Sequence, residues 1–160
     1  MEHTKIYHST HFQHHELEVI IEGPIQPELL QTLTMHEQLD AFRPPAEQLA
    51  ALEEIARLPE GRIIIARDSS MIIGYVTFHY PDELERWSEG DMSDLIELGA
   101  VEVANDYRSL GLGKRMIQLA FLENQMESYI VYTTEYYWHW DLQGSGLDVW
   151  EYREIMVKLM

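Results

Sequence analysis

The chain has 160 residues, no cysteine, and 28 acidic against 11 basic side chains, so its formal net charge is −17. A chain of this length fits one domain, residues 1–160, and its 46% hydrophobic residues can build a core without disulfides or a cysteine-based zinc site. The negative charge disfavours nucleic acids and anionic membrane surfaces as partners, and it favours cationic ones.

The N-terminus, MEHTKIYHSTHFQHH, lacks the basic start and apolar core of a signal peptide, and no apolar run in the chain reaches about 18 residues. We therefore expect a cytoplasmic protein. His8, His11 and His15 would share one face of a helix, which suggests a metal site, but no acidic or cysteine partner stands at a fixed spacing from them. We favour a solvated, flexible segment over residues 1–16 and no metal.

The first half of the chain predicts a strand, two helices and a hairpin. Residues 17–22 are β-rich and end at a Gly-Pro pair, and a proline in the first turn opens a predicted helix over residues 27–36. Residues 46–58 place leucine and isoleucine at helical spacing before a second proline. The β-rich runs 62–67 and 72–80 flank a short polar turn, which predicts an antiparallel hairpin.

An acid-rich connection follows the hairpin. Seven acidic side chains lie between Asp82 and Glu97, with Arg86 as the only basic one. A solvated loop is the ordinary interpretation of such a run. Its position directly before a predicted strand also makes it a place where a lysine-bearing partner could dock.

The second half of the chain predicts a strand at residues 95–103, a helix over 111–126, a strand at 129–134 and a helix from 148 to 160. A strand, a helix and a strand with a connection of this length predict a parallel pair joined by a right-handed crossover. The full order is β-α-α-β-β-β-α-β-α, which indicates a mixed α/β sheet with helices on both faces.

The loop from Arg108 to Lys114, RSLGLGK, has the features of an anion site. Its two glycines let the backbone approach a ligand closely, and the amides at the start of the following helix carry a partial positive charge. Arg108 and Lys114 can add side-chain charge. The loop lacks the spacing of a Walker motif and the third glycine of the dinucleotide fingerprint.

These residues resemble those of a known family. Arg108-x-x-Gly111-x-Gly113 after a strand is similar to the Arg/Gln-x-x-Gly-x-Gly/Ala acyl-CoA loop of the GNAT N-acetyltransferases, and the predicted element order resembles theirs. Longer strings, among them ELERWSEG and TEYYWHWDL, resemble a branch of that family that serves acetoin utilisation, over nearly the whole chain. For that branch the resemblance implies a protein lysine acetyltransferase that modifies, and so inactivates, acetyl-CoA synthetase.

The resemblance also implies a fold and a cosubstrate. The fold would be the GNAT fold and the cosubstrate acetyl-CoA. GNAT domains normally continue after the fourth helix into two more strands that wall the acceptor side, whereas this chain ends in a predicted helix at Met160. We expect the final two strands to be missing here, and a second chain in a homo-oligomer could complete the site.

The resemblance assigns cofactor-binding roles residue by residue. The backbone of Val101 and Val103 would pair with the pantetheine arm as an added strand. The thioester would lie where strands 95–103 and 129–134 part. The residues that would hold the pyrophosphate through their amides, supported by the side chains of Arg108 and Lys114, are Leu110, Gly111, Leu112, Gly113 and Lys114.

A carboxylate is expected as the general base, because a lysine amine is mostly protonated at neutral pH. Glu97 lies fourteen residues before Gly111 and matches the base of histone-type GNAT enzymes. Glu102 is the competitor. A regular strand would put Glu97 on the face of Val101 and Val103 and Glu102 on the other face, whereas a bulge would change that parity. We favour Glu97.

Tyr152 resembles the tyrosine that many GNAT enzymes place beside the CoA sulfur, where it would act as general acid. A tyrosine on the apolar stripe of a helix is also a common core residue, and Tyr136 and Tyr137 remain alternatives. Acidic neighbours argue against nucleic-acid binding by the nearby aromatic residues, so packing is favoured. The chain has neither a Gly-x-Ser-x-Gly motif nor a cysteine, so hydrolase chemistry is disfavoured.

Two other functions stay open on the sequence alone. A small amine such as a polyamine would be attracted by the same negative charge. An acyl-CoA-binding regulatory module that has lost turnover would keep the same loop.

Overall fold

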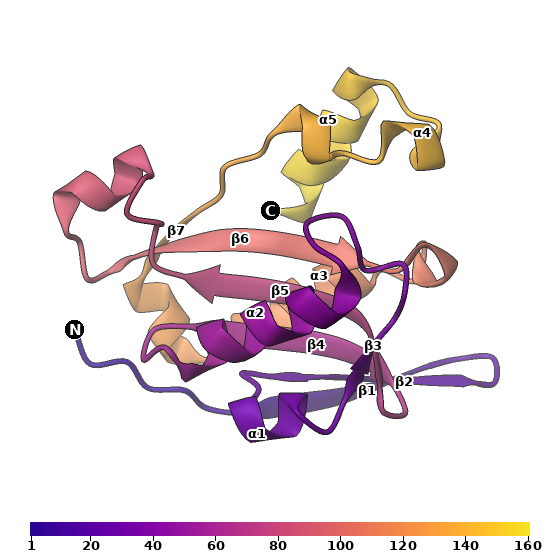
Figure 1. Cartoon of the computed structure of the whole chain (residues 1–160), viewed down its shortest axis with the longest axis horizontal. Helices are drawn as coiled ribbons and strands as arrows, with labels where there is room; N and C mark the ends of the chain where they lie inside the picture. The colour runs from indigo at the N-terminus through magenta and orange to yellow at the C-terminus, as the bar shows by residue number, and fades with distance from the viewer.

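A seven-stranded mixed sheet forms the centre of the computed structural model, which describes residues 1–160 (Figure 1). Six strands lie in the order β1-β2-β4-β5-β6-β7, and β3 pairs with β5. The β6–β7 and β3–β5 pairs are parallel and the others are antiparallel. The strands are β1 (His8–His14), β2 (Leu17–Gly23), β3 (Thr34–Met35), β4 (Arg62–Asp68), β5 (Met71–His79), β6 (Leu95–Val103) and β7 (Ile130–Tyr132).

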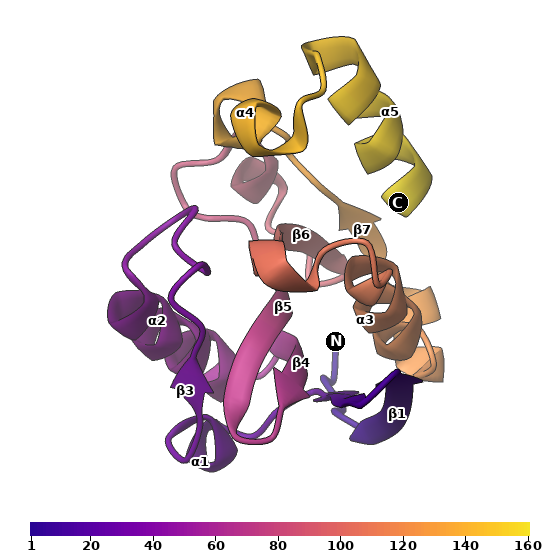
Figure 2. The same ribbon diagram turned by 90° about the vertical axis from the view of Figure 1, so that its right-hand side faces the viewer.

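Helices cover both faces of this sheet (Figure 2). One apolar core lies between the sheet and α3 and contains Met116, and a second lies on the side of α1 and α2 and contains Leu52. The helices are α1 (Pro27–Leu30), α2 (Pro45–Arg57), α3 (Leu112–Ala120), α4 (Leu142–Ser145) and α5 (Val149–Leu159). The predicted mixed α/β class and the parallel β6-α3-β7 crossover are confirmed.

Two predicted helices are wrong in their extent. The helix expected over residues 27–36 ends at Leu30, because the backbone of Thr34 and Met35 pairs with the start of β5 instead. The helix expected over residues 111–126 ends at Ala120, and a short 3-10 helix (Asn124–Ser128) follows. The chain turns there so that Glu123, which is 2% exposed, lies 3.7 Å from the buried guanidinium of Arg62.

The N-terminal segment differs from the expected flexible stretch. His8–His14 forms β1 and pairs along its whole length with β2, so the helical face assumed for the histidines does not exist. Phe12 packs against the core beside α3, and His11 bonds to Glu18 at 2.8 Å. No group of three His, Cys, Asp or Glu side chains is placed to hold a metal ion.

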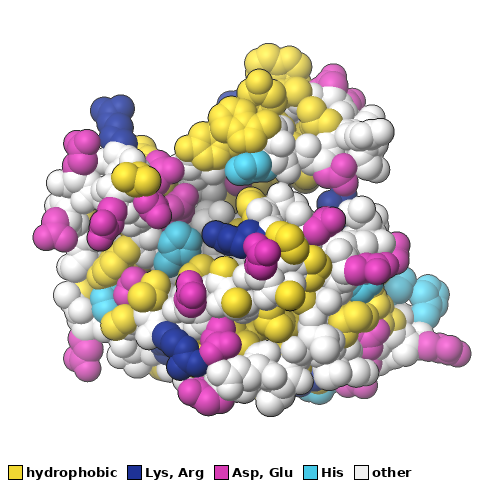
Figure 3. All heavy atoms as spheres, viewed as in Figure 1, with side chains coloured by type: hydrophobic (Ala, Val, Ile, Leu, Met, Phe, Trp, Pro, Cys, Tyr) yellow, Lys and Arg dark blue, Asp and Glu magenta, His cyan; other side chains and the backbone are white.

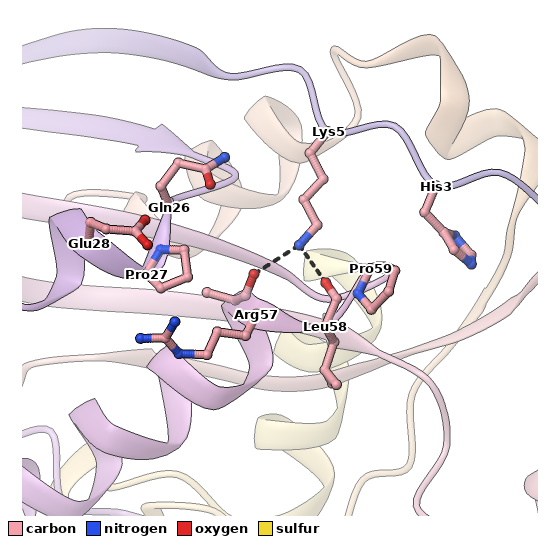
Figure 4. Close-up of a pocket in the computed structure, with 9 residues that line it drawn as sticks. His3, Lys5, Gln26, Pro27, Glu28, Arg57, Leu58 and Pro59 are labelled. Carbon is pink, nitrogen blue, oxygen red and sulfur yellow. Dashed lines mark hydrogen bonds between the residues drawn. The ribbon is translucent and has the colours of Figure 1, made fainter.

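Lys5 fixes the residues before β1 to the end of α2. Its Nζ donates hydrogen bonds to the carbonyl oxygens of Ala56 (2.9 Å) and Leu58 (2.6 Å), at the rim of a polar hollow of about 560 Å³ (Figure 4). These carbonyls carry the negative end of the helix dipole, so the ammonium group stabilises them. The buried Arg62 adds a bond to the Thr4 carbonyl, at 2.7 Å.

The last elements, α4 and α5, lie beyond β6, and the C-terminal end of α5 comes close to α3, where Leu159 packs against the core (Figures 1 and 2). The sequence predicted α5 but not α4, which is a single turn that begins at Asp141. No strand follows α5 within the 160 residues. None of the helices combines the length and the apolar character that a membrane-spanning segment needs.

Candidate active site

A bulge at Gly99 interrupts β6. The register with β5 runs from Thr77 opposite Ala100 to Phe78 opposite Leu98, so Gly99 is the extra residue. A Cβ at this position would lie 2.5 Å from the Nε2 of His79, which explains why glycine occupies it. Of the two arrangements considered from the sequence, β6 therefore has the bulged one, and the bulge moves every side chain after it to the other face.

The edge of β6 is open beyond Glu97. β7 pairs with β6 only from Leu95–Ile130 to Glu97–Tyr132, and the two strands then part. A side-chain bond from Thr133 Oγ1 to the Leu98 carbonyl (3.0 Å) marks the start of the gap. The backbone of residues 99–103 has no neighbouring strand on this side, which is the condition for pairing with an extended ligand.

The N-terminus of α3 lies beside this open edge. Gly111 is its N-cap residue, has a left-handed backbone with φ of 69°, and provides no side-chain cap. The first amides of a helix have no partner within it, so those of Leu112, Gly113 and Lys114 can donate hydrogen bonds to an anion. A Cβ at Gly111 would meet nothing within 4 Å, while one at Gly113 would touch Val101 at 3.4 Å.

A cavity of about 740 Å³ lies between β6, the loop before α3, the loop before α2 and the C-terminal segment. Of the residues predicted from the sequence, it brings together Val101, Glu102, Val103, Arg108, Gly113 and Tyr152. Glu97, Leu110, Gly111, Leu112 and Lys114 are not among its lining residues. Lys114 is exposed, Leu112 is buried, and Leu110 packs against the core beside α3.

Glu102 is buried on the wall of this cavity, with 7% of its surface exposed. Its Oε1 accepts the backbone N–H of Ala41 (2.9 Å), and its Oε2 accepts the hydroxyl of Tyr75, a side chain that is completely buried. Burial raises the pKa of Glu102, and the two hydrogen bonds oppose that shift. Both carboxylate oxygens therefore already accept a hydrogen bond, one from the loop before α2 and one from β5.

Glu97 lies at the last β6–β7 pair, opposite Tyr132 and, on β5, opposite His79. Burial raises the pKa of Glu97, while His79 opposes this shift. Burial together with the nearby charge of Glu97 raises the pKa of Tyr132 to about 12. Trp87, from the acid-rich connection, packs on the Tyr132 ring with centroids 5.3 Å apart. No motif or spacing in the sequence marks Tyr132 as part of this site, which only the pairing of β6 with β7 reveals.

Tyr152 of α5 lies on the cavity and stacks on Trp140, with ring centroids 5.2 Å apart. Of the alternatives, Tyr136 stacks on Trp138 and Tyr137 is exposed, and neither lines the cavity. Arg108 forms an ion pair of 2.6 Å with Asp141. The Asp-x-x-Gly spacing could have predicted Asp141 as a helix cap, but not this partner 33 residues away.

An uncapped helix N-terminus after a bulged strand, beside a strand edge that opens into a cavity, defines an acyl-CoA-dependent acyltransferase of the GNAT type. Residues 29–145 match the model of the acetyltransferase (GNAT) family, and the chain belongs to that family. The predicted resemblance is thereby confirmed, and the protein is an acetyltransferase.

Two bacterial relatives and one crystal structure match all or nearly all of the chain. The chain is 60% identical over all its 160 residues to the acetoin utilization protein AcuA of Bacillus subtilis and 56% identical to that of Bacillus licheniformis, covering 76% of each. The crystal structure of an acetoin utilization protein from Exiguobacterium sibiricum superimposes with a TM-score of 0.95 at 52% identity, over 98% of this chain and 74% of that one.

Proposed function

We propose that this acetyltransferase transfers the acetyl group of acetyl-CoA to a lysine of a protein acceptor, and that the acceptor is acetyl-CoA synthetase. The observation that carries the acyl-CoA part is the position of the uncapped α3 N-terminus beside the open edge of β6. The identity of the acceptor rests on the resemblance to the acetoin branch of the family, supported by relatives at 56–60% identity.

The residues present fit acetyl-CoA. The amides of the α3 N-terminus can receive the diphosphate, and the unpaired backbone of Val101 and Val103 can bond to the pantetheine arm. The cavity volume of about 740 Å³ lies within the range of ligand-binding pockets, about 300–1,000 Å³. When bound, acetyl-CoA supplies an activated acetyl thioester.

Two side chains would move protons. Glu97, at the point where β6 and β7 part, takes a proton from the acceptor ammonium and so frees the nitrogen lone pair for attack on the acetyl carbonyl carbon. Tyr152 gives its hydroxyl proton to the sulfur as the carbon–sulfur bond breaks, and recovers one from the newly formed amide nitrogen. Glu102 is less suited to the first role, because both of its oxygens already accept hydrogen bonds.

The surface next to Glu97 favours a cationic acceptor. Acidic side chains gather on the segment between β5 and β6 (Figure 3), which includes a 3-10 helix at Arg86–Gly90. Asp82, Glu83 and Glu89 are all exposed there. The negative electrostatic potential of these side chains attracts a lysine-bearing surface and raises its association rate.

The test is a direct comparison of acceptors. The purified protein and acetyl-CoA are incubated with acetyl-CoA synthetase and, separately, with spermidine, and acetylated products are read by mass spectrometry. We expect acetyl-lysine on the synthetase and little acetylated spermidine. Acetylation of spermidine alone would favour the small-amine enzyme, and CoA binding without any acetylation would favour a regulatory binding module.

A further inference from the structure

The ion pair between Arg108 and Asp141 joins the two sides of the cofactor cavity. Arg108 belongs to the loop before α3, and Asp141 belongs to the α4 segment, by which we mean residues 136–146. Arg108 Nη1 lies 2.6 Å from Asp141 Oδ2, and both residues line the cavity. The pair is partly open to solvent, with the two side chains 39% and 33% exposed.

The charges on the cavity wall do not suit an anionic ligand in this arrangement. Its lining residues with a formal charge at neutral pH are Glu102, Arg108 and Asp141, two acids against one base. The Arg108 guanidinium holds the pKa of Asp141 below its usual range, so this carboxylate is ionised at neutral pH. The positive charge of Arg108 is thus neutralised at the place where a diphosphate should bind.

The fold holds the Asp141 carboxylate in place from a second side. Its Oδ1 accepts the backbone N–H of Gly144 (2.8 Å), as the N-cap of α4. A Cβ on Gly144 would lie 2.2 Å from Asp141 Oδ2, so the carboxylate can occupy this position only because residue 144 is glycine. The α4 segment also contacts the loop before α2, where the rings of Phe42 and His139 meet edge to face at 5.5 Å.

We propose that Asp141 competes with the diphosphate of the cosubstrate for Arg108, so that the α4 segment acts as a latch on the cofactor cavity and lowers the affinity for CoA. This inference rests on the proposed function, because it takes CoA as the ligand of the cavity. A contact that must break before a ligand can bind reduces the apparent affinity by the free energy of that contact.

Binding of CoA would therefore exchange one anionic partner of Arg108 for another. The carboxylate of Asp141 leaves the guanidinium and returns to water, and the diphosphate takes its place next to the α3 amides. An ion pair that is partly open to solvent contributes up to about 1 kcal/mol, so its removal should tighten CoA binding by roughly two- to fivefold. Asp141 is in this respect an affinity-determining residue and has no part in proton transfer.

Isothermal titration of CoA into the wild-type protein and three variants tests this proposal. D141N removes the charge that pairs with Arg108. G144A keeps that charge but displaces the carboxylate, since the new methyl group occupies its position. E154Q is the matched control, because it removes one negative charge from α5 at an exposed residue that does not line the cavity and lies 4.0 Å from Lys158.

We expect D141N and G144A to bind CoA roughly two- to fivefold more tightly than wild type, and E154Q to bind as wild type does. The KM for acetyl-CoA should fall in the same two variants while kcat stays the same. Equal or weaker CoA binding by D141N and G144A, with normal binding by wild type, would overturn the latch alone. Wild-type protein that binds no CoA would overturn the proposed function and the latch together.

Discussion

Glu97 and Glu102 face the same side of β6, although they are five positions apart. Their partners on β5 are His79 and Tyr75, which lie four positions apart on a regular stretch of strand and so share a face. Because Gly99 is an extra residue on β6, the five positions from Glu97 to Glu102 pair with only four positions on β5, and the two glutamates come to the same face. Both carboxylates therefore point toward the side of α1 and α2, and their surroundings, not their face, distinguish their roles.

E97Q should lower kcat by about 100-fold and leave the Kd for acetyl-CoA nearly unchanged, because it removes a base and not a phosphate contact. Burial raises the pKa of Glu97 above the ordinary carboxyl value of 4.5. A base must be deprotonated to act, so wild-type activity should rise with pH through a midpoint above 4.5. The pH profile of kcat/KM should lose this acid limb in E97Q.

E102Q serves as the comparison, since it makes the same change on the same face of the same strand. It should keep the acid limb of the pH profile and lose activity by less than tenfold. An E97Q variant that retains the limb, together with an E102Q variant that loses it, would assign the base to Glu102 instead.

E102Q should also change how stability depends on pH. Burial raises the folded-state pKa of Glu102 above 4.5, so the folded protein holds this proton more tightly than the unfolded chain does. The free energy of unfolding of the wild-type protein therefore falls as pH rises from about 4.5 through the raised pKa. The E102Q protein has no carboxyl group at this position, so its free energy of unfolding does not show this fall. In urea unfolding, the free energy of unfolding of E102Q relative to that of wild type should be higher at pH 8 than at pH 5. A difference that is the same at both pH values would contradict a raised pKa of Glu102 in the folded protein.

The elements that sequence predicts well here are those fixed by local chemistry. β4, β5, β6 and the glycine-rich turn into α3 follow from β-branched runs and glycine spacing within a few residues. β1 has no such local signal, because its side chains are mostly polar and its stability comes from pairing with β2. An edge strand of this kind has little apolar periodicity to reveal it.

The parts of the site that sequence does not reveal depend on distant partners. Glu102 is held by Tyr75 and by Ala41, 27 and 61 residues away, and neither contact has a local signal. The bulge at Gly99 is visible only in the register with β5, and it reverses the parity argument for every residue beyond it. Side-chain spacing along one strand could not have decided between the two glutamates.

G111D should reduce CoA affinity by at least about 100-fold. The new side chain would enter the open space at the α3 N-terminus, place a negative charge where the diphosphate binds, and strain a backbone with φ of 69°. G111N is the matched control, because it adds a side chain of the same size at the same strained backbone position without the negative charge. CoA titrations should show the larger loss for G111D, and equal losses in both variants would mean that strain, not the anion site, is responsible.

Removing acidic charge beside Glu97 should weaken binding of the acceptor and not of acetyl-CoA. In the double variant E83Q/E89Q the field that attracts a lysine-bearing surface is reduced, so the KM for the protein acceptor should rise roughly two- to fivefold at low salt. The effect should shrink in 0.5 M salt, with a Debye length of about 4 Å. E47Q/E54Q on α2 removes the same charge from exposed positions away from Glu97 and should leave this KM unchanged. Steady-state kinetics with the acceptor varied at saturating acetyl-CoA measures both, and an equal rise in the two double variants would show that net charge, rather than this segment, attracts the acceptor.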